Sequence, residues 1–124
     1  MAKSVAALAL DASFDYIDQC NSMIACSQQP TTYTEAVTTY ALATVAMTPD
    51  TDYTKAAGDA SGRKVTVAAK SGVSITNSGD ATHIALVKTG ATELVYVTTC
   101  TTQTLTAGGT VDFPAWDIEI ADPV

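Results

Sequence analysis

The sequence is poor in aromatic and basic residues. Only 6% of its 124 residues are aromatic, and six lysines and arginines are outnumbered by thirteen acidic residues, giving a formal net charge of −7. An acidic surface repels nucleic-acid phosphates and anionic lipid headgroups. No run approaches the ~18 consecutive apolar residues that cross a bilayer. We therefore expect neither nucleic acid nor membrane as a direct partner.

Cysteine and histidine are also scarce, with only Cys20, Cys26, Cys100 and His83. An odd number of cysteines argues against a closed disulfide framework. No Cys-x-x-Cys pair is present, so the set makes a poor zinc site. We interpret the cysteines as small buried thiols in a reducing compartment. A Cys20–Cys26 bridge, or a bridge between subunits, after release into an oxidising medium is the alternative.

Recognisable catalytic motifs are missing from the chain. There is no G-x-S-x-G, no H-E-x-x-H and no phosphate-binding glycine loop. His83 lies in a predicted strand, where a packed or hydrogen-bonded histidine is the simpler interpretation than a triad member. Asp50, Asp52 and Asp59 share a predicted loop but lack the glycine and terminal glutamate of a calcium loop. We expect no enzyme, and no catalytic, metal-binding or cofactor-binding residues.

The chain does have enough apolar material for a core, since 47% of its residues are hydrophobic. Its length fits one domain, 1–124. Within it we expect an N-terminal arm over 1–7, a helix over 8–20 and a β-domain over 22–124. The apolar run near the N-terminus is too short for a signal peptide and acidic residues follow at once, so we expect folding in a cytosol.

The expected helix depends on apolar residues at helical spacing. Three of them should share one face: Leu10, Phe14 and Ile17. Three aspartates should fall largely on the other side: Asp11, Asp15 and Asp18.

Most of the remaining chain has the pattern of short strands separated by turn residues. We expect strands over 22–26, 44–48, 63–69, 73–75, 82–88, 93–100, 103–106, 110–113 and 116–120. A short helical turn is expected near Thr34, a loop over 49–62, a turn at Ser71-Gly72, a turn over 77–80, and hairpins at 89–92 and 107–109. The pattern predicts a mainly β fold, an antiparallel β-sandwich or barrel-like domain with one short N-terminal α-helix.

Four charged residues are candidates for contacts with a neighbouring subunit. Asp117 and Glu119 alternate with apolar residues and so share the polar face of the last strand. Arg63 and Lys64 form the one basic dipeptide of the chain. In an acidic protein such a dipeptide is expected to pair internally or across a subunit boundary.

Four segments together resemble a family of small proteins encoded by tailed bacteriophages and prophages. They are CSQQPTTY (26–33), SGRKVTVAA (61–69), GDATHIAL (79–86) and FPAWDIEIADP (113–123). The resemblance runs from about Leu10 to Pro123. The segments carry no chemistry, and the family offers no catalytic residues to transfer to this chain.

The resemblance implies a structural protein of the virion. We expect a capsid decoration or cement protein that is made in the host bacterial cytoplasm, forms a homo-oligomer and binds the major capsid protein, or other virion proteins, at the capsid surface. A tail, connector or fibre-associated protein is one alternative. A small carbohydrate- or cell-surface-binding module is another, with stacking surface from Tyr16, Tyr33, Tyr40, Tyr53 and Tyr96.

Overall fold

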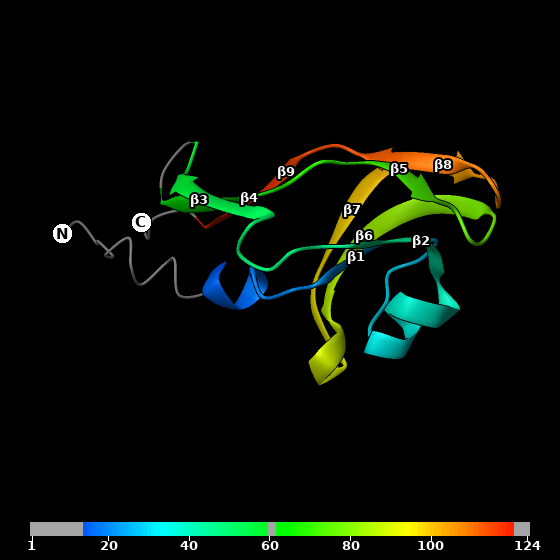
Figure 1. The fold of residues 1–124 in the computed structure, drawn as a ribbon, viewed down its shortest axis with the longest axis horizontal. Coiled ribbons are helices and arrows are strands. Elements are labelled where there is room, and N and C mark those ends of the chain that lie inside the picture. The colour runs from blue at the N-terminus through cyan, green and yellow to red at the C-terminus, as the bar shows by residue number, and fades with distance from the viewer. Residues whose placement is uncertain (1–13, 60–61, 121–124) are drawn as a thin grey trace.

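The computed structural model describes residues 14–59 and 62–120. In chain order the elements are β1 (Ser22–Cys26), the π-helical turn η1 (Glu35–Thr39), β2 (Ala41–Ala46), β3 (Tyr53–Ala57), β4 (Arg63–Val67), β5 (Lys70–Ser74), β6 (Gly79–Lys88), the 3-10 turn η2 (Thr89–Ala91), β7 (Glu93–Leu105), β8 (Thr110–Phe113) and β9 (Trp116–Ile120). The fold is mainly β with antiparallel sheets, as the sequence predicts (Figure 1). None of the described helical segments is long and apolar enough to span a membrane.

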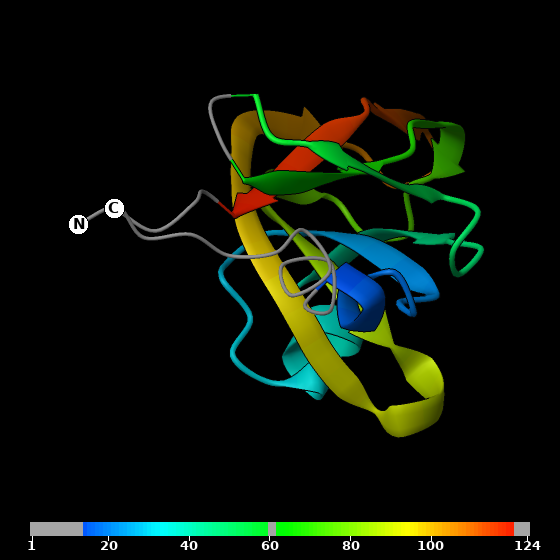
Figure 2. The ribbon, with the colours of Figure 1, turned by 90° about the vertical axis from the view of Figure 1, so that its left-hand side faces the viewer.

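The strands form two layers (Figures 1 and 2). One layer is a four-stranded sheet in the order β2-β1-β6-β7. The other contains a three-stranded sheet, β3-β4-β9, beside a two-stranded sheet, β5-β8. A single bridge between Ala43 and Ile75 links the layers next to β5. The described strands form an open sandwich and do not close into a barrel.

The main core lies between the two layers and draws side chains from all three sheets. Its largest fully buried members include Phe14, Met23, Leu86, Val65 and Val67. A second apolar cluster lies on the opposite face of the four-stranded sheet, where η1 covers it. Its buried members are Ile24, Cys26, Ala36, Ala41, Ala85 and Val87. Both faces of β1 and β6 are therefore covered, and every residue of β1 is buried.

Tyr96 of β7 and Trp116 of β9 stack with ring centroids 5.9 Å apart. The two rings belong to different sheets, and stacked aromatic pairs add stability beyond the area they bury. The contact ties the edge of the four-stranded sheet to the edge of the three-stranded one.

Several expected elements are confirmed. The strands over 22–26 and 116–120 both have the predicted bounds. The helical turn predicted near Thr34 is η1, and the hairpin at 89–92 joins β6 to β7. Thr92 there has a positive φ of 48°, which suits a tight turn.

The expected helix over 8–20 is too long at its C-terminal end. Helical backbone is present at 14–17, while residues 1–13, including the expected arm and Leu10 and Asp11, lie outside the described residues. After Ile17 the chain tightens, since the Cys20 N–H donates to the Ile17 carbonyl at 3.0 Å. The placement of Asp18 on the exposed side was wrong. Its side chain turns inward and the residue is only 4% exposed.

The expected loop over 49–62 contains a strand that the sequence did not predict, and the expected strand over 44–48 had the wrong bounds. Residues 53–57 form β3, paired in register with all five residues of β4. Lysine and alanine have low intrinsic strand preference, so this strand is stabilised by its pairing and not by its own composition. The strand expected over 44–48 is β2, which starts and ends earlier, at Ala41 and Ala46.

Two expected turns are placed differently in the structure. Ser71-Gly72 lies inside β5, where the register against β8 shifts and Gly72 has a φ of 66°. Only glycine adopts this backbone without strain, so the residue makes a bulge where we expected a turn. The expected hairpin at 107–109 was also wrong. The strand over 103–106 is the end of β7, and β8 pairs with β5 in another sheet.

Asp18 follows the N-terminal helical turn and forms an ion pair with a lysine of the three-stranded sheet. Lys55 of β3 contacts Asp18 at 2.9 Å and also bonds Asp15. Burial raises the pKa of the Asp18 carboxyl, against the opposing effect of Lys55. A buried carboxylate is costly unless it is paired, so this ion pair allows the N-terminal turn to pack on the sandwich.

We therefore expect Lys55→Met to destabilise the protein by about 2 kcal/mol at pH 7, because it leaves a buried carboxylate without its cation. The loss should shrink below the Asp18 pKa, where the neutral carboxyl needs no cation. Chemical denaturation at pH 7 and at pH 3, which is below even the ordinary carboxyl pKa of 3.8, measures both. Asp15→Asn is the control: that side chain is 62% exposed, and its loss should cost less than about 0.5 kcal/mol. Equal losses for the two variants would contradict this account.

Candidate functional site

The structure brings the four charged candidates together on β4 and β9. Lys64 lies opposite Glu119, Thr66 opposite Asp117, and Arg63 opposite Ile120. Side chains alternate along a strand, so Lys64, Asp117 and Glu119 share the outer face of the three-stranded sheet. Arg63 alternates with Lys64 and falls on the face of the buried Val65.

Lys64 and Asp117 both make contacts within the chain. The Lys64 ammonium is 2.7 Å from Asp59 and 3.4 Å from Asp117, and the first of these contacts raises the pKa of Lys64. The Thr66 hydroxyl donates to Asp117 at 2.7 Å, which holds the pKa of that carboxyl below its usual range. Lys64 thus pairs internally, as expected. A place in a subunit interface stays a prediction for all four residues.

We expect Thr66→Val to raise the pKa of Asp117 toward the ordinary value of 3.8. A carboxyl with a lowered folded-state pKa stabilises the protein above its unfolded pKa, and this contribution is lost as pH falls through the folded pKa. The variant should therefore be less stable than wild type at pH 6, with a difference that shrinks below pH ~4. Carboxyl NMR titration and denaturation measure the two effects. Thr54→Val is the control, because Thr54 lies opposite Thr66 on β3.

Other residues of chemical interest are dispersed. Asp59 bonds Lys64, whereas Asp52 lies 3.0 Å from Lys70 and accepts the Thr48 N–H. Asp50 occupies a turn with a φ of 64°. Within 14–59 and 62–120, no group of three histidine, cysteine or acidic residues is placed to hold a metal.

His83 lies opposite Cys26 of β1 and Thr99 of β7. Its Nδ1 is 2.8 Å from the Thr82 hydroxyl, so the expectation of a hydrogen-bonded histidine is confirmed. Burial raises the pKa of the Cys26 thiol to about 12, and the thiol approaches the Ala36 carbonyl at 3.7 Å. A thiol kept protonated is a poor nucleophile even beside a histidine.

The five tyrosines do not form one stacking surface. Tyr53 is buried and donates to the Cys20 carbonyl at 2.9 Å. Tyr96 is stacked on Trp116, and Tyr16 lies beneath the Lys88 ammonium. The other two, Tyr33 and Tyr40, pack against the second apolar cluster.

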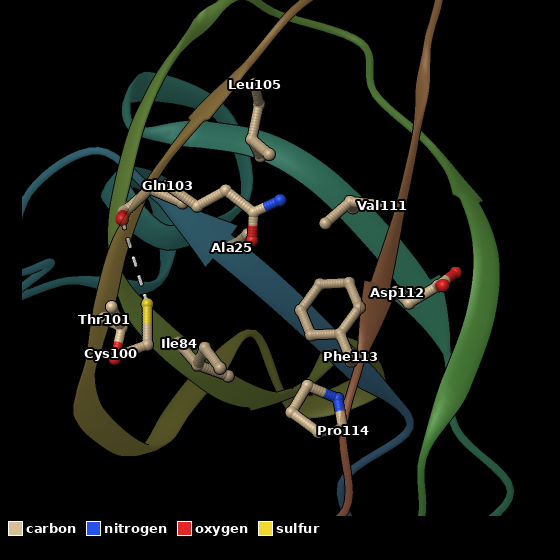
Figure 3. Close-up of a pocket in the computed structure, with 11 residues that line it drawn as sticks. Ala25, Ile84, Cys100, Thr101, Gln103, Leu105, Val111, Asp112, Phe113 and Pro114 are labelled. Atoms are coloured by element: carbon tan, nitrogen blue, oxygen red, sulfur yellow. Dashed lines mark hydrogen bonds between the residues drawn. The ribbon is translucent and has the colours of Figure 1, made fainter.

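A pocket of about 200 Å³ lies between the two layers, beside the C-terminal half of β7. Figure 3 shows Val111 and Phe113 of β8 facing Ile84 and Leu105 across it. The Asp112 carboxylate points away toward β5, where it accepts the Gly72 N–H at 2.8 Å (Figure 3). The pocket is therefore lined mainly by apolar side chains and no charge points into it, and the exposed residues Thr101 and Gln103 supply polar groups at its rim (Figure 3).

A break in the alternation of β7 shapes this pocket. Between the pairs Ala81–Gln103 and His83–Thr99 the register against β6 shifts, so β7 contains extra residues there. A bulge re-aims side chains, and the consecutive residues Cys100 and Thr101 both line the pocket. Sequence analysis missed this site because it divided β7 into two strands and paired the second with β8.

The outer edge of β7 is the second distinctive surface. β7 is last in its sheet, and no described strand pairs with its outer side. Figure 2 shows it running along the side of the molecule. Residues 94–105 contain no charged residue, and all of them except Leu105 are half-buried or exposed. Lysine and proline, which commonly guard exposed edges, are absent from β7.

Comparison with known proteins finds no match: no family model, no curated protein and no solved structure resembles the chain.

The three thiols should differ in reactivity. Burial raises the pKa of Cys20 and Cys26 to about 12, whereas Cys100 is half-buried in the pocket wall. At pH 8, and at a concentration where the protein is monomeric, we expect a disulfide reagent to modify Cys100 alone in the native protein. The reaction should be slower than for free cysteine, because burial raises the Cys100 pKa as well.

Denaturant should expose the two remaining thiols, and Cys100→Ser should abolish the native-state reaction. Native-state modification of Cys20 or Cys26 in that variant would contradict the assigned burial.

Proposed function

We propose that this chain is a structural protein of a bacteriophage virion that decorates the capsid by binding the lattice of the major capsid protein. The phage-protein resemblance of the sequence supports the virion context. The observation that carries the docking role is the β7 edge: a long, uncharged strand edge without a described partner on an acidic protein.

The energetics of such an edge favour protein partners. Unpaired backbone N–H and C=O groups along a strand edge are a template for adding a strand from another chain. In β7 the stretch Tyr96–Thr99 pairs regularly with β6, between two register shifts. It is therefore the straightest part of the edge and the best candidate to accept a strand. Its lack of charge avoids the cost of desolvating ions in the interface.

The first test is whether the protein is part of the particle. Mass spectrometry of gradient-purified particles should find the chain in a fixed ratio to the major capsid protein. Cryo-electron microscopy should show its density at regular positions on the head. Density on the tail alone would replace the capsid role with a tail role, and absence from the particle would refute the proposal.

A single substitution tests the edge itself. Thr99 is exposed at the regular part of β7, and Thr99→Lys places there the charge that natural edges use to prevent pairing. We expect this variant to fold normally and to lose at least about tenfold in affinity for particles that lack the protein. Thr110→Lys, on the exposed start of β8, is the matched control. Equal binding by both variants would exclude the β7 edge as the docking surface.

A further inference from the structure

We propose that the apolar pocket beside β7 is filled by the N-terminal segment Val5–Leu10 of a second copy of this chain. The inference deepens the proposed assembly role by naming one partner and one contact. It concerns the purified chain alone, so it does not depend on the head or tail location.

The pocket fits one apolar side chain. A cavity of about 150 Å³ lined by aliphatic and aromatic groups holds a benzene ring, and this pocket offers about 200 Å³. Its walls include Ile84, Leu105, Val111 and Phe113. Filling it would remove apolar surface from water without the cost of burying a charge.

The described surface of a second copy has no suitable side chain for this pocket. Tyr16 is the one large hydrophobic residue exposed in the described part of the chain, and the Lys88 ammonium lies 4.6 Å from its ring centroid. The sequence has another source in Val5–Leu10, with the sequence VAALAL, which precedes the described residues. Leu8 and Leu10 are its largest side chains.

Charge also favours this segment. Residues 1–10 contain one lysine, Lys3, and no acidic residue, whereas the whole chain carries a net charge of −7. Two acidic copies repel each other in general. Because the N-terminal segment contains a lysine and no acidic residue, its contact with an uncharged pocket involves less repulsion than a contact between two acidic surfaces.

The position of the described N-terminus favours a contact between copies. The described chain begins with a helical turn on the side of β3 and β4, whereas β8, a wall of the pocket, lies toward the other end of the long axis (Figure 1). A contact in which a segment of one copy enters the pocket of the next is heterologous and builds rings or filaments.

Two full-length variants test the contact. Leu8→Asp places a charge on the segment, and Gln103→Lys places one at the mouth of the pocket. Each should weaken self-association at least about tenfold in sedimentation equilibrium, the effect expected from loss of one buried anchor. Gln29→Lys, at an exposed site in the loop after β1, is the matched control and should associate like the wild type.

Mixing the two defective variants gives the decisive measurement. Leu8→Asp keeps an intact pocket and Gln103→Lys keeps an intact segment, so together they should form a one-to-one complex that neither forms alone. In that complex Cys100 of the Leu8→Asp copy should be protected from modification. Unreactive Cys20 and Cys26 verify that each variant is folded.

Two results would overturn the proposal. If the mixture stays monomeric while Leu8→Asp exposes Cys100, the segment fills the pocket of its own chain. If either variant self-associates as tightly as the wild type, the copies contact each other through another surface. Neither result bears on whether the protein is found in purified particles, so the two proposals fail separately.

Discussion

The sandwich depends on the double coverage of β1 and β6. These strands lie at the centre of the four-stranded sheet, with a core on each face, so β1 is buried over all five residues. Such a strand needs apolar side chains on both faces, and the four residues from Met23 to Cys26 supply them. The two clusters then place the other elements: one holds the second layer, the other holds η1. The fully buried Cys26, beside Ala36 of η1, belongs to this arrangement, which accounts for a thiol that packs and does not react.

Charge and apolar surface are separated in this molecule. The ion pairs tie elements of the sandwich to each other, as Lys55 does for the N-terminal turn and Lys64 for β9. Residues 94–105 of β7, by contrast, contain no charged residue, and the Asp112 carboxylate beside the adjoining pocket points away from it toward Gly72 (Figure 3). On an acidic protein this makes β7 the surface where another chain meets the least electrostatic resistance. The same strand shapes both features, because its register shift against β6 turns Cys100 and Thr101 toward the pocket.

Local patterns in the sequence predicted the elements that depend on local chemistry. Alternation in WDIEI identified β9, and the turn residues between β6 and β7 identified their hairpin. These local patterns failed to predict features that depend on contacts with residues far away in the sequence. β3 contains the weak strand formers Lys55, Ala56 and Ala57, and exists because β4 pairs with it along its whole length. Asp18 looked like a surface residue, since nothing nearby in the sequence reveals that Lys55 will reach it from the other layer.

By itself the sequence determined the mainly β class, the positions of most strands, the acidic composition and the placement of Asp117 and Glu119 on one polar face of the last strand. These follow from side-chain period and composition, which each strand carries in its own residues. The tertiary structure decided which strands share a sheet, the inward turn of Asp18, and the pocket between β7 and β8. Residues 107–109 show the reason. Their glycines favour a turn in either case, but whether the flanking strands pair with each other or with β6 and β5 depends on contacts between residues far apart in the chain.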